Sequence, residues 1–369
     1  MKISFYVPNL LSWSGEEFVN GGLNRYAWAL IELMQEMGWE VEVHQNGNQN
    51  WIREVKGVKV VGHRVACFSP EAVIEEINSQ SKKVLYSTFL QKTSYYKKNS
   101  IVISHGVCWD SPDIKTEKKE EIIRICGQIL EDVDLMISCD YNFLNVMRAI
   151  FPACTEKIKV IPNFVELNKF NNKEIIKQNI DDKIKILYPY RLDNCRASDT
   201  FLQLADYFLN SSEEIEILTI GDKNSIESNL EIVNFLKRER VITYNSKSHD
   251  MPEIYQKADI VIIPSKYSEE TSFSCIEAMA CGKAVIASNV GGLCNLIING
   301  YNGILVSPKF KSFRKAVQFL IDNQKARNIL GERASQVVKA FSHNLWKQQW
   351  RRYLQAVYCN EDGHYEKEI

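Results

Sequence analysis

Short runs of hydrophobic residues alternate with amphipathic stretches along the whole chain. The runs have the length of strands, as in Lys2–Val7 and Ile260–Pro264, whereas Gly22–Met37 repeats its apolar residues at helical spacing. Apolar strands separated by helices are typical of parallel sheets that helices cover on both faces. The pattern therefore predicts an α/β fold built on doubly wound parallel sheets.

A polar segment divides this pattern into two series of strands. Residues 166–182 are rich in Lys, Asn and Asp and offer little to bury, a composition typical of a linker. We therefore expect an N-terminal domain over residues 1–165 and a C-terminal domain over residues 183–344, which agrees with a length of 369 residues. Such sheets bind ligands at the carboxyl ends of their strands, so candidate site residues are those that follow strands.

Composition and charge argue against several functional classes. The 45 Lys and Arg residues nearly balance 46 Asp and Glu, and this net charge of -1 disfavours dedicated nucleic-acid binding. The ten cysteines form no CxxC pair and no zinc-ligand spacing, as expected of a reduced protein. No run approaches the ~20 apolar residues of a membrane span, and Pro8 interrupts the apolar start that a signal peptide needs. We therefore expect a cytoplasmic protein.

The most informative stretch follows the strand at Ile260–Pro264. A short polar loop containing Glu269 leads into a helix that begins near Ser272 and carries Glu277. A helix N-terminus offers unpaired N–H groups and a positive dipole end, which together bind phosphate. Carboxylates on the loop and on the helix are placed to bind hydroxyl groups on either side of that phosphate. The alternative is that Glu269 and Glu270 only stabilise the start of the helix.

Three further signals are weaker on their own. Arg191 and Arg196 follow the strand Ile184–Tyr188. Fixed cations at a strand end would stabilise the negative charge that develops on a leaving group during a reaction. The alternative is a pair of surface arginines without a role in catalysis. Gly21-Gly22 opens a helix and allows close approach of the backbone to an anion, but such pairs are common in turns. His105 ends a buried strand, where a lone histidine is more often structural.

Taken together, the second half resembles the signature of the retaining GT-B glycosyltransferase family 4, the glycosyl transferases group 1. The resemblance rests on Glu269-x7-Glu277, on Ala-Met-Ala-x-Gly over 278–282 and on Val-Gly-Gly over 290–292. It implies two Rossmann-like domains that face a central cleft, the first on the acceptor side and the second binding the donor. It also implies that Glu269 contacts the donor sugar, that Glu277 binds the ribose, and that the main chain of Ser272–Phe273 holds the diphosphate.

The resemblance also gives roles to the weaker signals. The catalytic residues it implies are Arg191, Arg196, Glu269 and His105. The donor-binding residues it implies are Gly21, Gly22, Ser272, Phe273, Glu277 and Asn163. The chain departs from the family pattern where Ala197 follows Arg196, where Glu-Thr-Ser over 270–272 replaces Gly-Phe-Gly, and where Phe164 follows Asn163 in place of glycine. We expect the crowding by Glu-Thr-Ser to alter which sugar fits, and Arg196 to keep the positive charge in a different geometry.

The sequence thus predicts an enzyme that moves a hexose-type sugar from a nucleotide diphosphate to an acceptor hydroxyl with retention. The expected partners are the nucleotide-sugar donor and a glycan or lipid-linked acceptor of cell-surface polysaccharide, glycolipid or glycoconjugate synthesis. No metal or other cofactor is expected, since an acidic helix end before a strand explains Asp132-Val-Asp134. The helix at 345–358 is expected to pack on the first domain. Peripheral contact at the inner face of the membrane is a second possible role for its Trp346, Trp350, Arg351 and Arg352.

Two rival functions remain open at the level of the sequence. A sugar-nucleotide 2-epimerase or a phosphorylase uses similar halves, although the Glu-x7-Glu spacing favours transfer and the cofactor lysine motif of a phosphorylase is not evident. A non-catalytic sugar-nucleotide-binding subunit is the alternative from another class. The sequence does not distinguish among UDP, GDP, ADP and dTDP as the nucleotide.

Overall fold

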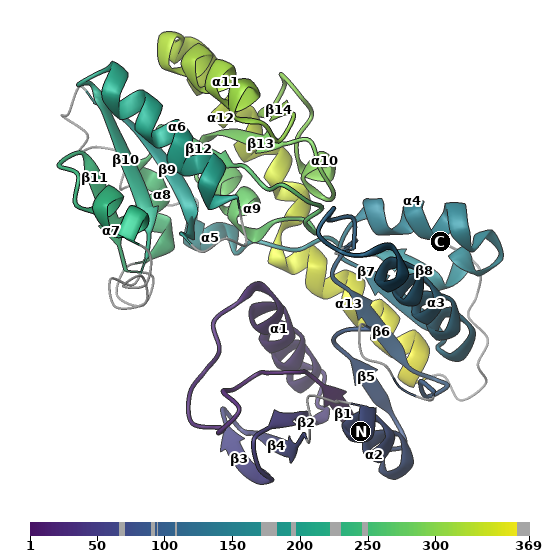
Figure 1. The fold of residues 1–369 in the computed structure, drawn as a ribbon. Helices are drawn as coiled ribbons and strands as arrows, with labels where there is room; N and C mark the ends of the chain where they lie inside the picture. Colours follow the sequence, from purple (N-terminus) through teal and green to yellow (C-terminus); the bar gives the residue numbers. More distant parts are fainter. Residues whose placement is uncertain are drawn as a thin grey trace. The chain divides into compact units, whose positions relative to one another are not determined.

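The protein consists of two compact units, which Figure 1 shows in ribbon form. The computed structural model describes residues 1–65, 71–89, 93, 95–107, 109–170, 183–192, 197–221, 230–245 and 250–359. The first unit comprises Met1–Pro162 together with the segment from Trp346, and the second comprises Asn163–Leu345. The chain therefore passes between the units twice.

The first unit contains an eight-stranded sheet with the order β3-β4-β2-β1-β5-β6-β7-β8. Its strands are β1 (Lys2–Tyr6), β2 (Glu40–Gly47), β3 (Trp51–Val55), β4 (Val58–Arg64), β5 (Val84–Tyr86), β6 (Ile101–Ser104), β7 (Leu135–Ser138) and β8 (Ile158–Val160). Its helices are α1 (Gly22–Glu36), α2 (Glu71–Gln80), α3 (Thr116–Asp132), α4 (Tyr141–Ile150), the 3-10 helix η2 (Pro152–Lys157) and most of α13 (His343–Tyr358).

One edge of this sheet is antiparallel, whereas the sequence pattern predicts a wholly parallel one. β3 and β4 form a hairpin in which Val55 pairs with Val58. The turn residues Lys56 and Gly57 have φ angles of 52° and 71°, as a two-residue hairpin turn that follows the strand twist requires. Asn, Asp and Gly are the residues that favour positive φ angles in such turns, and lysine does not. The Lys-Gly pair is therefore a weak sequence signal for the turn.

Helix α13 completes the core of the first unit. The Trp350 indole Nε1 donates a hydrogen bond to the Tyr26 hydroxyl of α1 at 2.8 Å, and the Tyr358 hydroxyl donates to the Val84 carbonyl at 2.6 Å. Trp346 and Trp350 are buried, with 2% and 0% of their surface exposed. Packing within the first unit therefore covers both tryptophan side chains. Arg351 and Arg352 of the same helix are exposed, and peripheral membrane contact stays a prediction.

The second unit contains a six-stranded parallel sheet with the order β11-β10-β9-β12-β13-β14. Its strands are β9 (Ile184–Arg191), β10 (Ile215–Ile220), β11 (Val241–Tyr244), β12 (Ile260–Ile263), β13 (Ala284–Ser288) and β14 (Ile304–Val306). Its helices are α5 (Leu167–Phe170), α6 (Ser198–Ser211), α7 (Leu230–Leu236), α8 (Met251–Lys257), α9 (Phe273–Ala280), α10 (Leu293–Leu296), α11 (Phe310–Asp322), α12 (Gln324–Val337) and the 3-10 helix η6 (Val338–Phe341).

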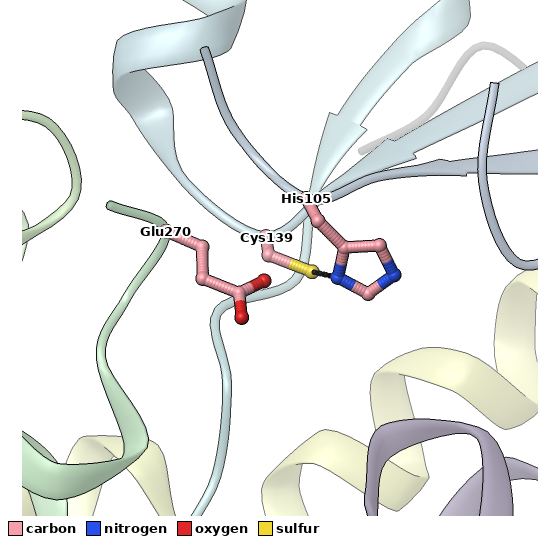
Figure 2. A group of neighbouring side chains, drawn as sticks. All are labelled: His105, Cys139 and Glu270. Atoms are coloured by element: carbon pink, nitrogen blue, oxygen red, sulfur yellow. Dashed lines mark hydrogen bonds between the residues drawn. The ribbon is translucent and has the colours of Figure 1, made fainter. Parts of the chain in front are cut away.

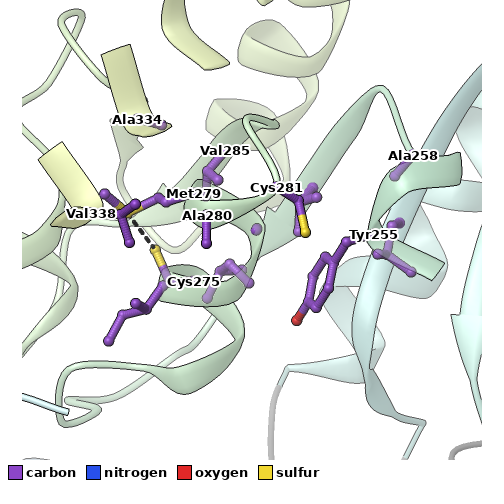
Figure 3. Close-up of a cluster of buried hydrophobic side chains, with 14 of the residues drawn as sticks. Tyr255, Ala258, Cys275, Met279, Ala280, Cys281, Val285, Ala334 and Val338 are labelled. Atoms are coloured by element: carbon purple, nitrogen blue, oxygen red, sulfur yellow. Dashed lines mark hydrogen bonds between the residues drawn. The ribbon is translucent and has the colours of Figure 1, made fainter. Parts of the chain in front are cut away.

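Alternating residues of the central strands fill separate cores on the two faces of this sheet. In β12, Val261 and Ile263 join one hydrophobic cluster, whereas Ile260 and Ile262 join the other. Figure 3 shows part of the first cluster, where Tyr255 of α8 and Met279 of α9 are among the buried side chains. Successive residues of a strand point to opposite faces, so an unbroken apolar run is what a sheet covered on both faces requires.

The division between the units falls at Pro162–Asn163, slightly before the expected end of the first domain at residue 165. Asn163 donates hydrogen bonds to Thr271 from its backbone N–H and from Nδ2, both at 2.7 Å. The Val165 N–H donates to the Phe341 carbonyl at 2.9 Å, and the His343 N–H donates to the Val165 carbonyl at 3.0 Å. These bonds join residues 163–165 to the second unit. Of the expected linker, residues 171–182 lie outside the described residues, and α5 lies before them.

Within the described part of the chain, none of the helices combines the length with the apolar character that crossing a bilayer demands.

Candidate functional site

The candidate site of the second unit lies at the reversal of its strand order. β9 pairs with β10 on one side and with β12 on the other, in parallel in both cases. The carboxyl ends of β9 and β12 therefore lie side by side at the topological switch point, where sheets of this kind bind ligands. The loop at residues 264–272 follows β12 and leads directly into α9.

Glu269 is a buried carboxylate in this loop, with 8% of its surface exposed. The Ser265 hydroxyl donates a hydrogen bond to its Oε1, and the Tyr190 hydroxyl donates to its Oε2 at 3.3 Å. Removal of a carboxylate from water is costly unless hydrogen bonds replace those lost, and the two hydroxyl groups supply them. Glu269 is thereby held as a hydrogen-bond acceptor.

Glu277 is a second buried carboxylate, 6% exposed, on the second turn of α9. The Tyr255 hydroxyl of α8 donates to its Oε2 at 3.1 Å. Burial, and to a lesser degree the negative charge of Glu277, raises the pKa of Tyr255 well above its ordinary value of 10. Tyr255 therefore remains a protonated donor at neutral pH and fixes the position of the carboxylate.

The start of α9 lies between these two carboxylates in the sequence. Ser272 precedes the first helical residue, but its side chain makes no capping hydrogen bond, and no acidic residue occupies the first turn. Its hydroxyl lies 2.9 Å from the Tyr190 hydroxyl instead. A helix start without a negatively charged cap is suited to an external anion.

Two glycines allow the loop to adopt this arrangement. A Cβ atom on Gly291 would lie 2.5 Å from the Glu269 carbonyl oxygen, and one on Gly292 would lie 2.5 Å from the Glu270 carbonyl carbon. Gly291 also has a φ angle of 50°. The Gly292 N–H donates to the Glu269 carbonyl at 2.6 Å. The Val-Gly-Gly turn thus packs directly against the backbone of the loop, which explains why side chains are absent there.

Asn163 also contacts this loop, through its two hydrogen bonds to Thr271. The side chain is 1% exposed, and its Oδ1 atom is buried without a hydrogen-bond partner. The Thr271 hydroxyl accepts the bond from the Asn163 N–H, a contact that phenylalanine at this position would not make. The departure from Gly-Phe-Gly at this point therefore ties the loop to the residue at which the second unit begins.

His105 lies in the first unit, directly after β6. Its Nε2 is 2.9 Å from the Ser87 carbonyl oxygen, which can only accept, so Nε2 carries the hydrogen. Cys139 Sγ lies 3.7 Å from Nδ1, as Figure 2 shows, and the Tyr26 ring meets the imidazole edge-on. In the neutral imidazole, Nδ1 is therefore the acceptor. Gly22 begins α1, the helix that carries Tyr26, and Gly21 precedes it in extended backbone.

The structure brings together only some of the residues predicted from the sequence. One group lies around the loop and α9 in the second unit: Asn163, Glu269, Ser272, Phe273 and Glu277. His105, Gly21 and Gly22 belong to the first unit. Arg191 is the last residue of β9, its side chain is not described, and Arg196 lies outside the described residues. Asp132 accepts a hydrogen bond from the Tyr96 N–H at 3.0 Å.

Three residues that hold the carboxylates were not identified from the sequence: Tyr190, Ser265 and Tyr255. Ser265 offered a signal, since a polar residue directly after a buried strand and four residues before Glu269 is a candidate partner. Tyr190 adjoins the predicted Arg191, but its direction cannot be read from the sequence. Tyr255 lies in a different helix from Glu277, and their contact depends on tertiary packing.

Comparison with known proteins agrees with this architecture. Residues 170–337 match the family model described as glycosyl transferases group 1. The D-inositol 3-phosphate glycosyltransferase of Paenarthrobacter aurescens is 23% identical, over 87% of this chain and 89% of its own length. Sucrose-phosphate synthase from Thermosynechococcus elongatus superposes with a TM-score of 0.75 at 18% identity, over 97% of this chain and 99% of that one. HepE of Anabaena, solved in complex with UDP, gives a TM-score of 0.70 at 16% identity, over 96% and 100%.

The fold is therefore the GT-B fold of two α/β domains on parallel sheets, with one antiparallel edge in the first. The stretch of the second unit that matches the glycosyl transferases group 1 model contains both buried carboxylates and the start of α9.

Proposed function

We propose that the protein is a retaining glycosyltransferase that moves a hexose-type sugar from a nucleotide diphosphate to an acceptor hydroxyl. The observation that carries the proposal is the pair of buried carboxylates, Glu269 and Glu277, held on either side of the uncapped start of α9. The match to the group 1 model supports it, as does the fold shared with HepE, which binds UDP. By analogy with the relatives, the acceptor is a glycan or a lipid-linked glycan of the cell surface.

The roles of the residues follow from charge and hydrogen-bonding capacity. The diphosphate binds at the start of α9, where the N–H groups of Ser272 and Phe273 and the helix dipole favour negative charge. Glu277 accepts hydrogen bonds from the ribose hydroxyls, and Glu269 accepts them from the sugar. His105 orients the sugar, Asn163 holds the loop through its hydrogen bonds to Thr271, and the backbone of Gly21 and Gly22 approaches the diphosphate.

The reaction exchanges one bond to the anomeric carbon for another on the same face. The bond from that carbon to the diphosphate oxygen breaks, the acceptor oxygen bonds to the carbon, and the acceptor proton passes to the departing phosphate. Arg191 and Arg196 stabilise the charge that grows on the diphosphate, which lowers the barrier because this charge is greater in the transition state than in the bound donor. We propose that no metal ion is required, since the helix dipole and the arginines supply the positive charge.

Calorimetry with a panel of nucleoside diphosphates and their sugar conjugates tests the proposal. We expect wild-type protein to bind one nucleoside diphosphate of the panel together with its sugar conjugate. We also expect it to hydrolyse that conjugate slowly in the absence of an acceptor. Glu277→Ala should weaken binding of the bare nucleoside diphosphate by about 30-fold or more, because the ribose loses a charged acceptor.

The matched control is Glu270→Ala, which removes a neighbouring carboxylate to which we assign no contact with the ribose. Wild-type affinity in Glu277→Ala contradicts the assignment. Binding of a sugar nucleotide without any turnover identifies the chain as a non-catalytic subunit instead.

A further inference from the structure

Tyr190 joins strand β9 to the loop that follows β12. Its ring is half-buried, and its hydroxyl lies 3.3 Å from Glu269 Oε2 and 2.9 Å from Ser272 Oγ. Glu269 and Ser272 lie on the two sides of Glu270-Thr271, so one hydroxyl group connects the buried carboxylate with the residue at the start of α9. No sequence motif assigns Tyr190 a role.

The direction of these hydrogen bonds follows from the donors available. The Tyr190 hydroxyl has a single hydrogen, which it donates to Glu269, so the Ser272 hydroxyl donates to the Tyr190 oxygen. Ser265 donates to the other oxygen of Glu269. The carboxylate is therefore fixed by hydroxyl groups from two separate elements, β9 and the loop itself, and rotation about its final bond would break both contacts.

We propose that Tyr190 is a positioning residue of the donor site, which sets the orientation of Glu269 toward the hydroxyl groups of the donor sugar. This inference rests on the proposed function, because Glu269 meets a sugar only if the site takes a nucleotide sugar. Tyr190 itself acts through Glu269 and Ser272. A positioning role predicts a defect confined to the sugar, since the bare nucleoside diphosphate is bound by the start of α9 and by Glu277.

The test compares two affinities in the same protein. UDP and UDP-glucose serve as probes, or the matching GDP, ADP or dTDP pair if that pair binds wild type. Tyr190→Phe removes one oxygen atom and keeps the ring. We expect its affinity for the sugar nucleotide to fall about tenfold, while its affinity for the bare diphosphate stays within about twofold of wild type. The control is Tyr207→Phe on α6. It also removes a hydrogen-bonded tyrosine hydroxyl, which accepts a hydrogen bond from Arg314.

A double substitution tests the route of the effect. Ser272→Ala removes the hydroxyl that donates to Tyr190 and keeps the backbone N–H. We expect about a threefold loss of affinity for the sugar nucleotide in the wild-type background and no further loss in Tyr190→Phe, since the Ser272 hydroxyl acts through Tyr190.

Two outcomes overturn the proposal. In one, Tyr190→Phe binds both probes as wild type does. In the other, it loses affinity for both probes equally while its thermal unfolding matches that of Tyr207→Phe, which would show that Tyr190 supports the whole site. Wild-type protein that binds no nucleoside diphosphate contradicts the proposed function itself, so the two failures are distinguishable.

Discussion

Helices α4 and α9 each follow a strand of a parallel sheet, yet they begin in opposite ways. At α4, the buried Asp140 carboxylate accepts a hydrogen bond from the Phe143 N–H at 2.7 Å. At α9, Ser272 makes no side-chain cap, because its hydroxyl is engaged with Tyr190. The first helix satisfies its positive end with a negative charge from the protein itself. The second has no side-chain cap at Ser272, and it is at this helix start that we propose an anion binds.

The largest expected effect comes from giving α9 the cap that α4 has. In Ser272→Asp, the new carboxylate should bind the first N–H groups of the helix and repel a diphosphate. We expect the affinity for the nucleoside diphosphate to fall more than about 100-fold, with no loss of thermal stability. Calorimetry and thermal unfolding measure the two quantities. Ser272→Ala is the control, with affinity for the bare diphosphate near wild type, and retained affinity in Ser272→Asp would refute the comparison.

A smaller effect is expected from crowding the loop that supports the start of α9. In Gly292→Ala, the added Cβ would lie 2.5 Å from the Glu270 carbonyl carbon, so the loop must shift. We expect a loss of about 2 kcal/mol in unfolding free energy and about a tenfold weaker affinity for the diphosphate. Gly300→Ala is a matched control for stability, since nothing lies within 4 Å of a Cβ there, although its φ of 76° adds backbone strain. Unchanged binding in Gly292→Ala would show that the loop tolerates the shift.

The smallest expected effect is the loss of the cap at α4. Asp140→Ala should lower the unfolding free energy by about 1 kcal/mol, or about 3 °C in Tm, because the Phe143 N–H loses its partner. Nucleotide affinity should not change, since the Asp140 carboxylate is buried as the cap of α4 and has no assigned contact with the donor. A scanning calorimeter measures the first quantity and titration calorimetry the second. Weaker nucleotide binding in this variant would mean that the start of α4 is also part of a binding site.

The parts of the fold that depend on local pattern could be predicted from the sequence. The apolar runs gave the parallel strands, since β12 is buried on both faces and contains only Ile and Val. The β3–β4 hairpin could not be predicted, because Lys56 adopts a left-handed conformation that its residue type does not favour. The boundary at Asn163 depends on hydrogen bonds to Thr271, more than 100 residues away in the sequence.

The same limit applies to the candidate site. The spacing of Glu269 and Glu277 around a helix start could be read directly, and the structure places them there. Their hydroxyl partners depend on tertiary packing, because Tyr190 and Tyr255 come from β9 and α8. The burial of Trp346 and Trp350 could not be predicted for a related reason. An amphipathic helix shows which face is apolar, and only the fold shows that Tyr26 covers Trp350.

The route of the chain has a consequence for the order in which the protein can assemble during translation. The second unit, Asn163–Leu345, is contiguous, so all of its strands have left the ribosome before the first unit receives its last helix. Until Trp350 emerges, the Tyr26 hydroxyl lacks its indole partner and an apolar surface of α1 stays uncovered. The N-terminal unit is therefore synthesised first and finished last, and a nascent chain halted before residue 346 would expose that surface to chaperones.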